Sequence, residues 1–215
     1  MNKALINKMK QKLIEIAKKT LSKEDPAHDI NHALRVLKNA EEIALIEGGD
    51  LEVIVPAALL HDAVVYPKHS EKSKDSAKDS AIVARKILED LNYDEKIILR
   101  VEEAIIEHSF SNGIKPNKIE SKILQDADKL EITGVIGIMR TFCYTGIMKR
   151  EFYNNDDPFC ESREPNSLAY ALDLFFNRLL IAKDRMNTET ARIIAEERTK
   201  VLQEFLEHAK KEINS

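Results

Sequence analysis

The sequence predicts an all-α protein that folds as a single-domain helical bundle, and three observations lead to this prediction. The chain is rich in Ala, Leu, Ile, Glu and Lys, which favour helices. Six Gly and six Pro among 215 residues are few for a protein built on many tight turns, which argues against an all-β sandwich. Apolar residues recur at steps of three and four along most of the chain, as in a helix with one buried face.

The helical period and the end signals place the elements in chain order. Asp29 and Asp50 stand where N-terminal caps are expected, and Gly48 ends the helix between them. Pro56 interrupts the third helix or delays its start, and Pro67 ends it. The predicted helices cover about 3–20, 29–47, 50–66, 75–91, 94–109, 117–147 with a break at Gly134 or Gly137, 167–183 and 188–213.

Apolar stripes support individual helices, and two long stretches lack them. The irregular stretches are about 66–74 and 148–166, and loops of this length in compact domains are often functional. We therefore expect them to cover a site. The clearest stripes are Ile30, Leu34, Leu37, Ala40 and Ala44 in the second helix and Ala77, Ala81, Ala84, Leu88 and Leu91 in the fourth.

Composition and charge narrow the class of protein. The chain is 43% hydrophobic and 33% charged, which is typical of a soluble globular domain, and its length allows one domain, 1–215. The net charge of −4 disfavours duplex nucleic acid as a partner. Cys143 and Cys160 are too few for a disulfide framework or a cysteine zinc site, so we expect a cytoplasmic protein. The lysine-rich N-terminus and the short apolar run 53–60 predict neither a signal peptide nor a membrane segment.

Histidine and aspartate occupy helix positions that should be apolar. His32 shares its stripe with apolar residues four and eleven positions on. The doublet His61-Asp62 directly follows the apolar run 53–60, and Asp128 has an apolar residue four positions before it and four after. Because a buried, unpaired carboxylate costs several kcal/mol, such positions call for a cation or firm hydrogen bonds. One metal ion bound by these side chains would account for all of them.

The donor set of two imidazoles and two carboxylates suits a divalent ion better than a thiolate-preferring one. The two carboxylates neutralise such an ion, and four protein ligands leave open positions for a water and a phosphoryl oxygen if the ion is five- or six-coordinate. This chemistry predicts hydrolysis of a phosphate ester or anhydride. The ion itself stays open among Mn²⁺, Mg²⁺, Fe²⁺, Co²⁺, Ni²⁺ and Zn²⁺.

The ordered pattern of His32, His61-Asp62 and Asp128 resembles the HD superfamily of metal-dependent phosphohydrolases. The similarity covers about 22–210 and points to a bacterial and archaeal branch of small single-domain members, some of which are deoxynucleoside triphosphate pyrophosphohydrolases. It implies an HD-type helical bundle with a core of about 22–145 and C-terminal helices of about 167–213 packed on it. The matching motifs are AHDINH (27–32), ALLHD (58–62), HSFS (108–111) and QDADKLE (125–131) followed by GVIGI (134–138).

The resemblance implies roles for particular residues. The metal ligands would be His32, His61, Asp62 and Asp128, with Asp62 also catalytic. His108 would pack in the core or act as an acid, a phosphate contact or a ligand of a second ion. Arg35, Lys68 and Lys129 are placed to reach a phosphate, and Lys68 is also a candidate catalytic residue. We expect His28 and Asp29 to cap the helix or support the ligands, and Asp126 to orient a neighbour.

One position departs from a related branch of the superfamily. In the 5′-deoxynucleotidase branch a Glu three residues after the doublet assists catalysis, and Val65 occupies that position here. A mechanism that depends on this Glu is therefore not expected.

The leading hypothesis is cleavage of a (deoxy)nucleoside triphosphate to the monophosphate and pyrophosphate. The expected partner is thus a small phosphorylated molecule, and the oligomeric state stays open. One alternative is a phosphomonoesterase or phosphodiesterase for another small substrate, and another is a non-catalytic helical module stapled by metal. A zinc protease is disfavoured because His28 and His32 have its spacing but enclose Asp29 in place of Glu, without an evident third ligand.

Overall fold

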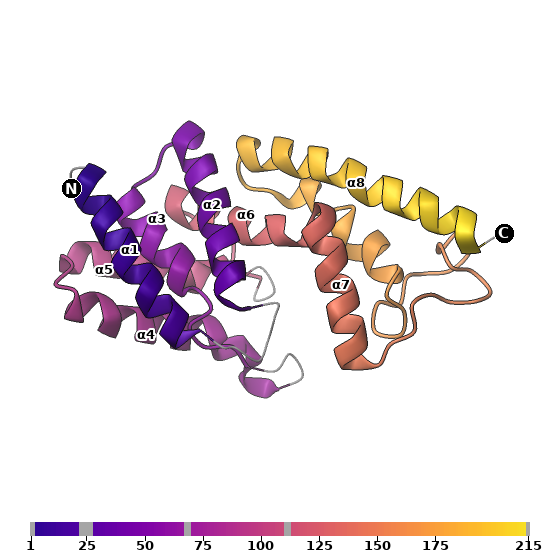
Figure 1. Cartoon of the computed structure of the whole chain (residues 1–215), viewed down its shortest axis with the longest axis horizontal. Helices are drawn as coiled ribbons and strands as arrows, with labels where there is room; N and C mark the ends of the chain where they lie inside the picture. Colours follow the sequence, from indigo (N-terminus) through magenta and orange to yellow (C-terminus); the bar gives the residue numbers. More distant parts are fainter. Residues whose placement is uncertain (1–2, 22–27, 67–69, 110–112, 214–215) are drawn as a thin grey trace. The chain divides into compact units, whose positions relative to one another are not determined.

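The computed structural model describes residues 3–21, 28–66, 70–109 and 113–213, and within these ranges helices are joined by turns and loops without a strand (Figure 1). This confirms the all-α prediction. The chain divides into two compact units, Met1–Asp128 and Lys129–Ser215, and the single-domain organisation stays a prediction. No helix in the described ranges is both long and apolar enough to cross a membrane.

The first unit is built around one short and largely buried helix. Helix α3 packs against α1, α2, α4 and α5, and every residue from Val53 to Leu60 is buried. The His61-Asp62 doublet follows directly, so the fold delivers it from the centre of the unit. The elements are α1 (Lys3–Thr20), α2 (Ile30–Glu47), α3 (Leu51–Leu60), the 3₁₀ helix η1 (Glu71–Asp75), α4 (Ser76–Asp90), α5 (Glu95–His108) and α6 (Ile119–Lys129).

Helix α3 differs from its prediction at both prolines. It runs without interruption from Leu51 through Pro56, and it ends at Leu60, before the doublet. Pro56 removes one backbone donor, but the burial of the surrounding side chains offsets this loss. Pro67, expected to end the helix, lies outside the described residues. The expected caps are confirmed, because the carboxylates of Asp29 and Asp50 accept from the N–H groups of His32 and Glu52.

The second unit packs an aromatic core between α7 and α8. Phe175 and Phe205 stack with ring centroids 5.3 Å apart, and Phe142 lies against both. The break predicted near Gly134 is confirmed, because a 3₁₀ turn precedes α7 there. The elements are η3 (Leu130–Ile132), α7 (Gly134–Met148), the π-helix η4 (Phe175–Leu179), the 3₁₀ helix η5 (Lys183–Arg185) and α8 (Glu189–Ile213).

The helix predicted over 167–183 is wrong as a regular α-helix. Turns lead into η4, where the N–H of Leu180 donates to the carbonyl of Phe175 at 2.9 Å. The buried carboxylate of Asp173 holds the start of this segment, because it accepts from Arg163 Nη2 at 2.8 Å and from the Asn166 N–H at 2.6 Å. These bonds tie the segment to the preceding loop in place of a regular helical turn.

Candidate metal centre

Four helices of the first unit bring histidine and aspartate side chains together. His32 lies in the first turn of α2, and His61 and Asp62 directly follow α3. His108 is the last residue of α5, and Asp128 lies in the last turn of α6. The three histidines are buried, whereas the Asp62 and Asp128 side chains are 16% and 34% exposed. The carboxylates therefore form the side of the cluster that solvent and a substrate can reach.

The polar atoms converge on one point. His32 Nε2 lies 3.2 Å from His61 Nε2, 3.4 Å from Asp62 Oδ2 and 3.5 Å from Asp128 Oδ1. His61 Nε2 lies 3.3 Å from the same Asp62 oxygen. Two ligands that share an ion at about 2.1 Å lie about 3.0–3.4 Å apart when their bonds make angles of 90–110°. The observed spacing thus fits one small divalent ion.

Local backbone contacts aim two of the rings. The Nδ1 atoms of His61 and His108 lie 2.9 Å and 2.5 Å from the carbonyl oxygens of Ala58 and Ile105, each three residues earlier. A hydrogen on Nδ1 satisfies that carbonyl and leaves the Nε2 lone pair facing the cluster, as a metal ligand requires. Asp29 has a comparable role for His32, since its Oδ1 accepts from the His32 N–H at 2.9 Å and fixes the first turn of α2.

The electrostatics of the cluster favour positive charge. Burial acts to lower the pKa of His61, but the carboxylates of Asp62 and Asp128 outweigh it and raise the pKa to about 9. Burial acts to raise the pKa of Asp62, yet the imidazoles of His61 and His32 hold it well below its usual value. The pKa of Asp128 is lowered by His32 and His61 against the same effect of burial. Both carboxylates are thus ionised at neutral pH and attract a cation.

His108 belongs to a second group of possible metal ligands, which shares His61 with the first group. Its Nε2 lies 3.8 Å from Asp62 Oδ1, and its ring centroid is 5.0 Å from that of His61. Burial and the neighbouring His61 lower the pKa of His108, which favours the neutral imidazole. In the described part of the chain, the groups able to hold an ion are His32, His61 and Asp128, and His61, Asp62 and His108.

Of the three residues predicted to contact phosphate, the structure describes Arg35 and Lys129. Arg35 lies one turn after His32 on α2 and is partly exposed. Lys129 follows Asp128, and its ammonium donates to the carbonyl of Arg185 at 2.5 Å. Lys68 lies outside the described residues. Their roles stay predictions. The role of Asp126, which is fully buried and lies two residues before Asp128, also stays a prediction.

His28 lies near the cluster but in neither of the two groups. Its ring centroid is 5.7 Å from that of His32. His28 also contributes to the lowered pKa of Asp62 through its charge. The geometry thus gives the zinc protease arrangement no support among the described residues.

The sequence did not predict roles for two buried amide side chains, those of Asn39 and Gln125. Asn39 Nδ2 donates to the carbonyl of Ala127, and Gln125 Nε2 donates to the carbonyl of Glu107. Both residues are polar positions on otherwise buried helix faces, and this pattern was the signal that could have identified them.

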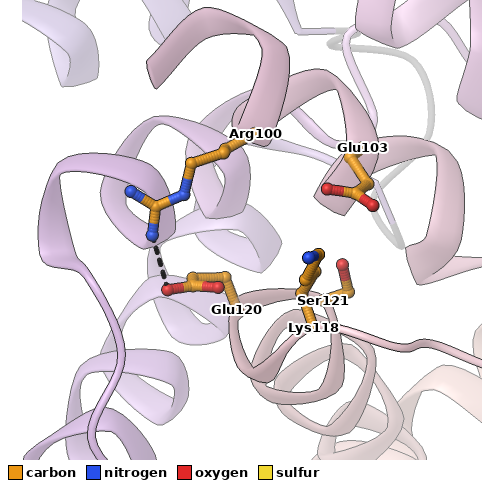
Figure 2. A pocket seen from close by; sticks show the side chains of 5 residues that line it. All are labelled: Arg100, Glu103, Lys118, Glu120 and Ser121. Atoms are coloured by element: carbon orange, nitrogen blue, oxygen red, sulfur yellow. Dashed lines mark hydrogen bonds and ion pairs between the residues drawn. The ribbon is translucent and has the colours of Figure 1, made fainter. Parts of the chain in front are cut away.

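A separate hollow lies between the middle of α5 and the start of α6. It encloses about 300 Å³ and is lined by Arg100, Glu103, Lys118, Glu120 and Ser121, none of which belongs to the cluster (Figure 2). Arg100 Nη2 lies 2.8 Å from Glu120 Oε1, and its Nη1 lies 2.7 Å from Asp50 Oδ2. This hollow thus marks an ion-paired junction of α3, α5 and α6.

Known proteins resemble the chain over most of its length. The family model of the HD domain matches residues 29–133. A curated relative, the uncharacterized protein YpgQ of Bacillus subtilis (strain 168), is 33% identical over 197 residues, which cover 90% of this chain and 88% of YpgQ. The range matched by the family model includes the whole set predicted to bind metal.

Solved structures agree with this assignment. An HD-superfamily hydrolase from Bacillus thuringiensis is 32% identical, with a TM-score of 0.74 and coverage of 98% of this chain and 99% of that one. B. subtilis YpgQ in complex with ADP is 28% identical, with a TM-score of 0.73 and coverage of 95% and 97%. The chain therefore belongs to the HD-domain superfamily and is a metal-dependent phosphohydrolase.

Proposed function

We propose that His32, His61, Asp62 and Asp128 bind one divalent ion and that the protein cleaves a (deoxy)nucleoside triphosphate to the monophosphate and pyrophosphate. The observation that carries the proposal is the convergence of Nε2 and carboxylate atoms from α2, α3 and α6 within 3.2–3.5 Å of His32 Nε2. A divalent cation bound here would be neutralised by the two carboxylates and would be coordinated by the two imidazoles.

Mn²⁺ is the first ion to test, because the mixed nitrogen and oxygen donor set suits it and leaves coordination positions open. When bound, such an ion activates a water and polarises a phosphoryl oxygen. A water oxygen would add to the α-phosphorus, and the bond from this phosphorus to the oxygen shared with the β-phosphorus would break, so that pyrophosphate leaves and the water gives up a proton.

The chain's own residues bind the substrate and handle charge. Arg35, Lys68 and Lys129 would contact phosphoryl oxygens and stabilise the negative charge that develops on them. His108, neutral and buried beside Asp62, would accept or donate a proton or contact a phosphate. The carboxylates of Asp62 and Asp128 are partly exposed, so an ion bound by them would be within reach of a phosphate.

The choice of a nucleotide draws support from a relative. The YpgQ structure in complex with ADP shows that a protein of similar fold accommodates a nucleotide. The superfamily membership applies equally to other phosphate esters, so the substrate is the finer part of the proposal. We also infer a cytoplasmic location, because Cys143 and Cys160 are both free thiols.

The proposal is tested by measuring phosphate release with Mn²⁺ across the nucleoside and deoxynucleoside tri-, di- and monophosphates. Each reaction is run with and without added inorganic pyrophosphatase. Release that requires the pyrophosphatase identifies pyrophosphate as the product, as we expect for triphosphates. Release without it would instead identify a phosphomonoesterase-type cleavage. Absence of release from every nucleotide would reject a nucleotide substrate.

A further inference from the structure

The carbonyl group directly before His108 is held by a buried amide. Helix α5 ends at His108, and Ser109 continues in an extended conformation, so the last carbonyls of α5 have no donor within the helix. Gln125 Nε2 donates to the carbonyl of Glu107 at 3.1 Å and to that of Ile114 at 3.3 Å. Gln125 is 2% exposed, so water does not compete for these bonds. One side chain of α6 thereby fixes the end of α5.

The carbonyl group directly before Asp128 is held in the same way from the other side. Asn39 lies on α2, seven residues and thus two helical turns after His32. Its Nδ2 donates to the carbonyl of Ala127 at 3.3 Å, and the residue is 5% exposed. This bond connects the helix that carries His32 to the helix that carries Asp128.

The two amides therefore hold the peptide groups from which two site side chains project. The peptide plane before a residue sets the direction of its Cα–Cβ bond, so a fixed carbonyl at Glu107 or Ala127 restricts where His108 or Asp128 can point. We propose that Asn39 and Gln125 are positioning residues that set the relative placement of α2, α5 and α6 around the metal ion. The inference rests on the proposed metal site and extends it to residues that act through the backbone.

A positioning role has a different consequence from a purely structural one. Outer residues that orient metal ligands typically change metal affinity about 10-fold to 100-fold when they are replaced. A residue that only stabilises the fold lowers the melting temperature and leaves the affinity of the folded protein unchanged. Metal affinity and ligand geometry, measured on folded protein, therefore separate the two roles.

The test uses Gln125→Met and Asn39→Leu, which remove the amide donors and nearly keep the side-chain volume. Arg100→Met is the matched control, because Arg100, in the middle of α5, pairs with Glu120 in the first turn of α6 (Figure 2). Arg100 precedes His108 by eight residues, and Glu120 precedes Asp128 by eight, which places this junction about 12 Å along each helix from the site. Co²⁺ serves as the probe, through calorimetric affinity and the visible absorption of the bound ion, with melting temperatures in parallel.

We expect both amide variants to bind Co²⁺ about 10-fold or more weakly and with an altered absorption spectrum at saturation. Arg100→Met should melt at a lower temperature and bind Co²⁺ as the wild type does. Wild-type affinity and spectrum in both amide variants would overturn the positioning role alone. If the wild type does not bind Co²⁺, or if Asp62→Ala binds it equally well, the proposed metal site is wrong and this inference falls with it.

Discussion

At the scale of single residues, local hydrogen bonds orient the histidines of the cluster. The rings of His61 and His108 are set by carbonyls three residues earlier, and the first turn around His32 is set by Asp29. The ligand atoms thus lie within bonding reach of one point because short-range contacts aim them there. Arg35, one turn after His32 on α2, carries one of the charges expected to meet the substrate, and it offers the clearest single-residue test.

Arg35→Met should impair catalysis without impairing metal binding. A charge-assisted hydrogen bond to a phosphate is worth about 1.5–3 kcal/mol, which corresponds to a loss of about 10-fold to 100-fold in kcat/KM. Lys38→Met, on the exposed side of the same helix, is the control and should behave as the wild type. Steady-state kinetics and Mn²⁺ titration of the two variants make the measurement. An unchanged kcat/KM in Arg35→Met would remove Arg35 from the site.

The convergence of these histidines and aspartates was predictable from the sequence, but the contacts that support them were not. A histidine or aspartate on an apolar stripe can be recognised from its neighbours in the sequence. The order His, His-Asp, Asp that is typical of the HD superfamily then connects the four positions. Asn39 and Gln125 bind backbone carbonyls 88 and 18 residues away, and periodicity does not pair a side chain with a distant carbonyl. The ammonium of Lys129 likewise donates to a carbonyl far along the chain, that of Arg185, which its position beside Asp128 did not suggest.

At the scale of elements, the start of α2 links helix capping to the metal centre. Asp29→Ala removes the cap of the turn that carries His32 and should lower the free energy of unfolding by about 1 kcal/mol. It should also weaken Mn²⁺ binding, because the ligand turn frays. Asp94→Ala removes the equivalent cap of α5, because the Asp94 carboxylate accepts from the Lys96 N–H. This cap lies at the end of α5 that is remote from His108. Urea unfolding should show a similar loss of stability in both variants, whereas Mn²⁺ titration should show weaker binding in Asp29→Ala alone. Equal Mn²⁺ binding by the two variants would contradict the link between the cap and the metal site.

The buried ion pair of the second unit makes a prediction about pH. Burial alone would raise the pKa of Asp173, but hydrogen bonds from Arg163 and from the Asn166 N–H lower it. Because the folded pKa lies below the unfolded value of about 3.9, the pair stabilises the protein above that pH. Its contribution is lost as the pH falls from the unfolded pKa through the folded one.

Asp173→Asn should therefore lower the free energy of unfolding at pH 7 by about 2 kcal/mol and flatten its dependence on acid. The measurement is urea unfolding at pH 7, 5 and 3, followed by circular dichroism. Asp156→Asn, at an exposed position, serves as the control and should keep the wild-type dependence. A parallel fall in wild type and Asp173→Asn between pH 5 and 3 would show that another group is responsible.

Helices were predicted well where local signals and tertiary packing agree. Helices α1, α2, α5 and α8 begin and end within a residue or two of the predicted limits, because their apolar periods are local signals and aspartate caps mark the starts of α2 and α5. The end of α3 was predicted too late, near 66 instead of at Leu60, and the helix continues through Pro56 because the packing of its buried side chains tolerates the proline. The π-helix at 175–179 depends on Asp173 binding a loop, and the period of apolar residues does not encode that bond.

At the scale of the whole molecule, the sequence and the structure lead to one class of protein. The HD pattern spans the first unit from His32 to Asp128, and YpgQ aligns with 90% of the chain. Helical composition and the ordered ligand set were sufficient for fold and reaction class. The substrate was not predictable to the same degree, because base and sugar recognition depend on pocket shape rather than on a motif.

Binding of the metal should stabilise the folded chain measurably. An ion present at 100 times its dissociation constant adds about 2.7 kcal/mol to the free energy of unfolding. For a chain of this size this corresponds to a rise in melting temperature of about 5–10 °C. Differential scanning calorimetry with Mn²⁺ should show this rise in the wild type and not in Asp62→Ala. An equal rise in both proteins would place the stabilising ion elsewhere.

The measurement that tests the central claim most directly is pyrophosphate release from nucleoside triphosphates by wild type and Asp62→Ala, each analysed for bound metal. We predict that the wild type binds a divalent ion and releases pyrophosphate, and that Asp62→Ala keeps its helical circular dichroism but loses the ion and at least about 100-fold of the activity. Undiminished turnover in a folded Asp62→Ala protein would contradict the assignment of this cluster as the metal centre.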